Sequence, residues 1–164
     1  MKRLRQLVPV LALVLALVPS PTLAATTYTE SVFGIETGFP QSTAECPAPN
    51  SVSPFAGIAA GTLNGVFVIG VCHTPLSPSA TIVTGLFTFG NGSTTVAGLF
   101  APGGTVSLLS TDVDDSVCVQ TYSASGGLLP SGSFSGRLTH YGLWTGTSCI
   151  VLFATISGSA VLTT

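Results

Sequence analysis

Short runs rich in Val, Ile, Phe, Thr and Tyr, separated by Gly, Pro and Asn, dominate this chain of 164 residues from residue 27 onward. β-Branched and aromatic residues are enriched in strands, whereas Gly, Pro and Asn favour the turns between them. No segment of this part has the Ala, Leu, Glu, Lys and Arg content that a solvent-facing helix prefers. About nine or ten short strands at intervals of about 8 to 12 residues are typical of all-β domains. The sequence therefore predicts an antiparallel β-sandwich or a small closed β-barrel of about 8–10 short strands.

The predicted strands are bounded by these turn residues. They cover residues 27–32, 56–63, 66–73, 80–89, 93–100, 105–110, 117–123, 133–141, 147–156 and 159–162. Asn64-Gly65 and Asn91-Gly92 suit tight hairpin turns. Polar and apolar residues alternate in 133–141, whereas 66–69 and 149–153 are apolar throughout. We expect both faces of these two apolar runs to be shielded from water, the second face by another layer, a ligand or another protein molecule.

The first 24 residues have the organisation of a secretory signal peptide. Residues 7–18 form an apolar stretch of 12 residues, and small side chains precede a cleavage site before Ala25. The positively charged residues before the apolar stretch are Lys2, Arg3 and Arg5. A retained membrane anchor is the alternative, but a span needs about 20 apolar residues. We expect cleavage of residues 1–24, which leaves 25–164 as a single secreted or cell-surface β-domain with no transmembrane span.

Cysteine usage agrees with export. Four cysteines, an even number, all follow the predicted signal peptide: Cys46, Cys72, Cys118 and Cys149. In an oxidising compartment this predicts that two disulfides staple the β-domain, with three pairings open. If the pairing is sequential, each bond closes a loop of about 30 residues and stabilises the fold by about 3–4 kcal/mol. The cysteines lack the short spacing of a zinc site, so we predict no metal there.

Charge is scarce, and its distribution excludes some partners. Charged residues make up 6% of the chain, against about 25% in an average protein. Arg137 is the one Lys or Arg after residue 24. A single cation cannot meet a phosphate backbone, so nucleic-acid binding is excluded. The mean hydropathy of +0.66 is likewise the opposite of an intrinsically disordered chain.

Catalytic motifs are absent from the sequence. The central residue of the segment Gly132 to Gly136 is Phe134, so it is no nucleophile elbow, and neither a His-Glu-x-x-His motif nor a P-loop occurs. His73 and His140 can be combined with many serines and six carboxylates, which singles out no set. We therefore predict no catalytic residues and no cofactor.

One cluster is a candidate ligand site: Arg137, His140, Tyr141 and Trp144. Trp144 could stack on a sugar or apolar ring while Arg137 or His140 binds a polar group. Strand alternation places Arg137 and His140 on opposite faces, which favours a packing role for Trp144 and His140 instead.

An acidic cluster, Asp112, Asp114 and Asp115, has the oxygen ligands that calcium prefers. The glycine and distal glutamate of a calcium-binding loop are missing, and Val113 interrupts the ligands. We favour a solvated turn over a calcium site.

These observations leave three hypotheses for function. The first is a non-enzymatic structural or protein-interaction module that contacts its own copies or a cell-envelope partner through apolar strands. The second is a β-barrel carrier for a small apolar ligand, and the third is an exported enzyme of unknown class.

Overall fold

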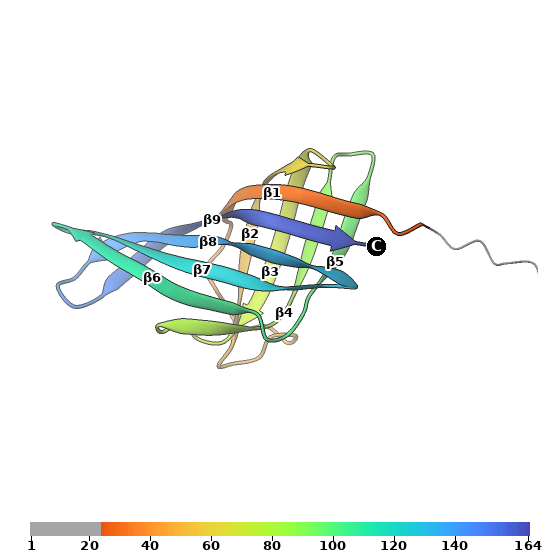
Figure 1. Cartoon of the computed structure of the whole chain (residues 1–164). Coiled ribbons are helices and arrows are strands. Elements are labelled where there is room, and N and C mark those ends of the chain that lie inside the picture. Colours follow the sequence, from red (N-terminus) through yellow and green to blue (C-terminus); the bar gives the residue numbers. More distant parts are fainter. Residues whose placement is uncertain (1–23) are drawn as a thin grey trace, which may run out of the picture.

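The computed structural model describes residues 24–164, and the predicted signal peptide lies outside this part apart from Ala24. Nine strands make up the structure (Figure 1). They are β1 (Thr27–Glu36), β2 (Ser51–Gly61), β3 (Gly65–His73), β4 (Ser79–Gly90), β5 (Thr95–Phe100), β6 (Thr105–Asp114), β7 (Val117–Leu129), β8 (Ser131–Trp144) and β9 (Cys149–Thr163). Among the described residues, no helix is long and apolar enough to cross a membrane.

The strands close into an antiparallel barrel, which confirms the all-β prediction and selects the barrel over the sandwich. The strands follow one another in the order β3-β2-β1-β9-β8-β7-β5-β4, and β3 also pairs with β4, so the sheet closes on itself. β5 and β6 share one position in the ring: β5 pairs with one part of β4 and β6 with another, and both pair with β7. The result is an eight-stranded barrel with one extra strand.

The strands are longer than the sequence predicts. Residues 51–54 and 126–129, expected in connections, belong to β2 and β7, and the last two predicted strands are one strand, β9. The reason lies in the partners: Gly126 and Gly127 pair with Phe134 and Ser133 of β8. A neighbouring strand forms hydrogen bonds with the backbone of these residues whatever their side chains are. These bonds outweigh the weak preference of glycine for strands.

Neither Asn-Gly pair forms the predicted two-residue turn. The last paired residues around the first are Ala59 and Gly65, and around the second Gly90 and Thr95. Asn64 adopts a positive φ of 51° and accepts a hydrogen bond from the Gly61 amide at 3.0 Å. The asparagines therefore stabilise longer loops than expected.

Five phenylalanines fill one end of the barrel, a group that we call the phenylalanine plug. Its members are Phe67, Phe87, Phe89, Phe100 and Phe134, all at most 6% exposed. Neighbouring rings lie 5.5–6.4 Å apart between centroids, the range of favourable tilted and edge-on contacts. A void of only about 10 Å³ remains between them.

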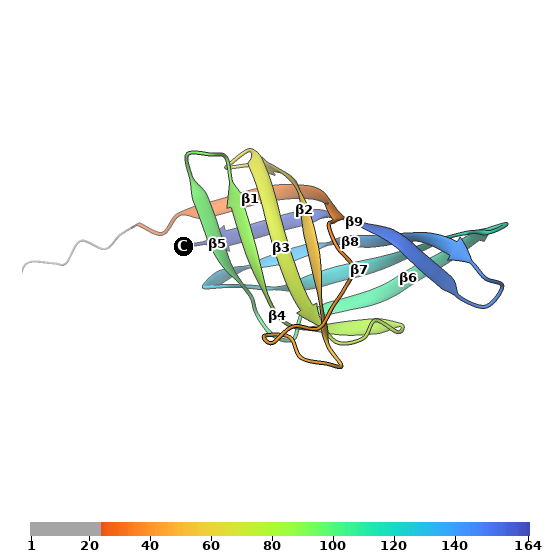
Figure 2. The same ribbon diagram turned by 180° about the vertical axis from the view of Figure 1, so that it is seen from behind.

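Two disulfides form, as predicted from four cysteines in an oxidising compartment, and of the three open pairings the structure has the sequential one, Cys46–Cys72 and Cys118–Cys149. Cys46–Cys72 ties the connection between β1 and β2 to the end of β3. Figure 2 shows this connection running from the end of β1 to the start of β2. Cys118–Cys149 joins β7 to β9 across β8, where these strands run on beyond the barrel (Figure 1).

The outer face of β1 to β5 is apolar and exposed. Val66 and Val68 are 60% and 57% exposed, while their neighbours Phe67 and Ile69 face the core. The chain itself therefore shields only one face of this run, and the expectation that another molecule covers the second face stays a prediction. Phe33, Ile58 and Val66 lie side by side on three paired strands and are all more than half exposed.

Candidate ligand cavity

The open end of the barrel contains a cavity of about 390 Å³, separate from the void within the plug. Small-molecule sites in proteins have volumes of about 300–1,000 Å³ and mainly apolar walls. Fourteen of the lining residues are apolar, among them Phe55, Ile82 and Ile156. The five polar ones are Glu36, Ser51, Ser53, His73 and His140. Volume and chemistry both match a site for a small molecule.

Two β-bulges shape the cavity wall. Between β3 and β4 the pairing shifts so that Cys72 faces Thr84 while His73 faces Ile82, which leaves Val83 as the extra residue. Between β8 and β9 a similar shift makes Leu152 the extra residue. Each bulge reverses which residues of its strand face inward, and this turns Ile82 and Val151 toward the cavity.

The mouth of the cavity is formed partly by the connection between β1 and β2. Phe39 and Pro40 line the cavity from this segment, and Phe39 is 79% exposed. The segment is fixed by the Cys46–Cys72 disulfide and by backbone hydrogen bonds between Gln41 and Val52. The cavity is thus bounded on one side by this disulfide-bonded loop and on the others by strand ends.

Ser53, His73 and Glu36 form the polar wall of the cavity. The Nδ1 atom of His73 lies 2.7 Å from the Thr74 carbonyl oxygen, which can only accept, so Nδ1 carries the proton. In this tautomer Nε2 accepts the Ser53 hydroxyl proton across 3.0 Å. This contact resembles that of a nucleophile and its base, but acyl transfer also requires donors aimed at the oxyanion. The contact by itself does not define a hydrolase.

Burial shifts the titration of two groups in the cavity. Burial raises the pKa of Glu36, and a hydrogen bond from Ser53 partly offsets this increase. Burial lowers the pKa of His140, and charge on His73 lowers it further. His140 also packs against Tyr122, with ring centroids 5.1 Å apart. The cavity therefore favours the uncharged form of His140 and disfavours the charged form of Glu36 when it has no partner.

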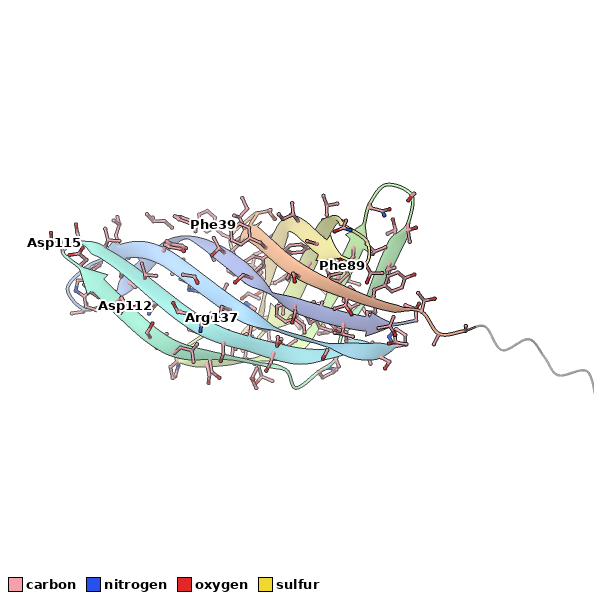
Figure 3. The ribbon with its side chains drawn as sticks, turned by 45° about the horizontal axis from the view of Figure 1, so that its top comes forward. Phe39, Phe89, Asp112, Asp115 and Arg137 are labelled. Carbon is pink, nitrogen blue, oxygen red and sulfur yellow. A yellow bond between two sulfur atoms is a disulfide. The ribbon has the colours of Figure 1, made fainter. Side chains whose placement is uncertain are left out.

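The predicted ligand cluster is divided by the strand alternation. His140 lines the cavity, whereas Arg137 is exposed on the outer face of β8, as Figure 3 shows. Tyr141 stacks on Phe153 with centroids 4.7 Å apart. Trp144 lies at the end of β8, where its amide donates to the Ser116 carbonyl at 2.8 Å. The structure thus brings one of the four residues to the cavity.

None of the residues of the acidic cluster lines the cavity, and Figure 3 shows Asp112 and Asp115 toward the tip of the projecting strands. Asp112 and Asp114 end β6, and Asp115 begins the turn with a φ of 51°. Ser110 donates a hydrogen bond to Asp112 at 3.1 Å. In residues 24–164 no group of three or more His, Cys, Asp or Glu side chains is arranged to hold a metal ion.

Sequence reasoning did not select Glu36, Ser53 or His73 as a site. Alternation places each on the inward face of its strand, together with buried residues such as Val32, Phe55 and Ile69. Polar residues on an otherwise apolar face are the available signal. Which strands lie side by side depends on the pairing register, which no spacing in the sequence reveals.

Fold and site together define a closed β-barrel with one filled end and one hollow, mainly apolar end. Comparison of the chain with protein-family models, with curated proteins and with solved structures found no match.

Proposed function

We propose that this protein binds a small, largely apolar molecule in the cavity at the open end of its barrel. The observation that carries the proposal is the contrast between the two ends. Phenylalanine rings close one end to about 10 Å³, whereas about 390 Å³ stays open at the other. Protein interiors are normally filled to crystal-like density, so an apolar space of this size favours a bound molecule.

The proposed place of action is outside the cytoplasm, on the cell surface or in the surrounding medium. The two disulfides support this, because such bonds persist mainly in oxidising compartments. A carrier or sensor of small apolar molecules in that compartment fits a compact disulfide-bonded barrel.

Titration with the neutral fluorescent probe N-phenyl-1-naphthylamine tests the proposal. We expect saturable binding with a stoichiometry of about one probe per barrel. The variant Ala80→Phe places a ring in the cavity and is expected to weaken binding at least about tenfold. Ala97→Phe is the matched control, because Ala97 is exposed on β5 and does not line the cavity. Equal binding by both variants, with both folded by circular dichroism, would contradict the proposal.

The second candidate is self-association through the outer face of β1 to β5. Its support is the row formed by Phe33, Ile58 and Val66, which are 56%, 62% and 60% exposed. Contiguous exposed apolar surface marks interaction sites in soluble proteins. A second copy is the proposed occupant, because this face has no charge that would repel an identical face.

Light scattering after gel filtration tests this candidate. We expect the wild type to form dimers or larger oligomers and Ile58→Asp to be a monomer, because a carboxylate would be buried in the interface. Ser135→Asp, on the exposed outer face of β8, is the control that adds the same charge elsewhere. A monomeric wild type would exclude this candidate without affecting the cavity.

A further inference from the structure

We infer that the molecule bound in the cavity is an amphipathic amine, with its apolar body in the barrel and its protonated amino group at the wall of Glu36, Ser53 and His73. This inference rests on the proposed function and adds the chemical class of the ligand.

The polar wall has few donor protons for its acceptors. Ser53 has one hydroxyl proton: Nε2 of His73 lies 3.0 Å from its oxygen, and Glu36, which lines the same cavity, adds a second acceptor. Nδ1 of His73 already donates to the Thr74 carbonyl oxygen, so it cannot supply a second proton. The wall therefore has more acceptors than donors, and an ammonium group, with three donors, complements it.

The charge of the cavity wall also favours an amine. Glu36, His73 and His140 are the titratable side chains that line the cavity, and no Lys or Arg lines it. Arg137, the one Lys or Arg in the described part of the chain, is exposed on the outer face of β8. A carboxylate ligand would meet the Glu36 carboxylate with no Lys or Arg in the cavity wall to offset the repulsion. An ammonium ligand would form the ion pair that Glu36 lacks.

Burial of the polar wall strengthens its interaction with a charged group. Ser53 is only 8% exposed, and Glu36 and His73 are both partly buried, so water screens the polar wall weakly. An ion pair in such a place is worth more than one on the surface. Most of the remaining cavity wall is apolar and suits an alkyl or ring system. A polar wall rich in hydrogen-bond acceptors lies beside an apolar volume. This arrangement matches a ligand with one amino group on a hydrocarbon body.

Competition between three ligands of equal chain length tests the inference. Decylamine, decan-1-ol and decanoate each displace N-phenyl-1-naphthylamine at pH 7.5, below their critical micelle concentrations. We expect decylamine to displace the probe at concentrations at least about tenfold lower than decanoate, with decan-1-ol between them. The reason is that hydrogen bonds between the ammonium group and the Glu36 carboxylate are stronger than hydrogen bonds between uncharged groups.

Two isosteric variants locate the selectivity. Glu36→Gln keeps the shape of the wall but removes its charge, and it is expected to reduce the difference between amine and carboxylate to about threefold or less. Glu45→Gln removes a carboxylate from an exposed position outside the cavity and is expected to keep the wild-type difference.

The outcomes separate the two proposals. If the probe binds but decanoate displaces it as well as decylamine does, the inference is overturned while the proposed function stands. Equal loss of selectivity in Glu45→Gln would also overturn it, because the preference would then come from overall charge. If the probe does not bind at all, the proposed function fails and the inference fails with it.

Discussion

The ring of Phe67 occupies the space that Gly34 leaves open on the inner face of β1. A Cβ atom built on Gly34 would lie 2.5 Å from Cζ of Phe67 and 2.5 Å from the Ala56 carbonyl oxygen. The glycine thus allows a phenylalanine on β3 to reach the facing strand and close the plug. The plug in turn determines where the cavity begins.

A double-mutant cycle measures this relationship. Gly34→Ala is expected to destabilise the fold by about 1–3 kcal/mol through overpacking, and Phe67→Leu by about 1 kcal/mol or more through lost packing. The cost of Gly34→Ala should be smaller in the Phe67→Leu background, because the smaller side chain frees part of the space. Urea unfolding of the four proteins gives the coupling. Fully additive costs would show that Phe67 does not limit position 34.

The two disulfides are expected to differ in their effect on ligand binding. Cys46–Cys72 holds the loop that carries Phe39 and Pro40, whereas Cys118–Cys149 joins the projecting strands and neither of its cysteines lines the cavity. Replacing either pair by alanines should cost about 3–4 kcal/mol of stability. Probe affinity should fall in Cys46→Ala/Cys72→Ala and change little in Cys118→Ala/Cys149→Ala. The same loss of affinity in both would mean that the loop is not a wall of the site.

Glu30 is expected to act as an internal cap for the loop between β2 and β3. Its side chain is 1% exposed, and Oε1 accepts the Leu63 amide proton at 2.7 Å. Glu30→Ala leaves that buried amide unpaired and should destabilise the fold by at least about 1–3 kcal/mol. Glu30→Gln keeps the Oε1 acceptor, so thermal unfolding should place it between the wild type and Glu30→Ala. A Gln variant as unstable as the Ala variant would show that the carboxylate charge matters more than the Leu63 contact.

The pKa of His140 predicts a pH dependence of stability. Burial lowers this pKa below its ordinary value of 6.5, so the unfolded chain takes up the proton at a higher pH than the folded chain does. The contribution of His140 to the free energy of unfolding is therefore present above pH 6.5 and falls as the pH drops toward the folded pKa. Acidification from pH 7.5 should destabilise the wild type more than His140→Asn.

The contribution of Glu36 to stability changes with pH in the opposite direction. The His140→Asn variant must therefore be compared with the wild type, since both proteins contain Glu36. Burial raises its pKa above the ordinary value of 4.5, so its contribution to stability falls as the pH rises through the interval above 4.5. Urea unfolding of the wild type and of His140→Asn over the same pH range gives the slope of the free energy of unfolding against pH for each protein. The difference between the two slopes is the contribution of His140. Identical slopes would contradict a depressed pKa for His140.

The sequence predicts the direction of some side chains in the strands and not of others. The alternation in 133–141 correctly places Phe134 in the core and Arg137 on the surface, because side chains alternate strictly along a strand. The same rule put Arg137 and His140 on opposite faces, and the structure has them there. It could not place Val83 and Leu152, because a bulge depends on the partner strand and leaves no mark in local polarity.

The sequence by itself determined the all-β class, the number of disulfides and the inward or outward direction of most strand residues, since these depend on local propensity, on cysteine number and on a period of two. Tertiary structure decided that the sheet closes into a barrel, that phenylalanines fill only one end, and that Glu36, Ser53 and His73 share one wall of the other. These residues lie on three strands, and their proximity follows from closure and register. Both are set by the pairing of distant segments, which a single sequence does not display.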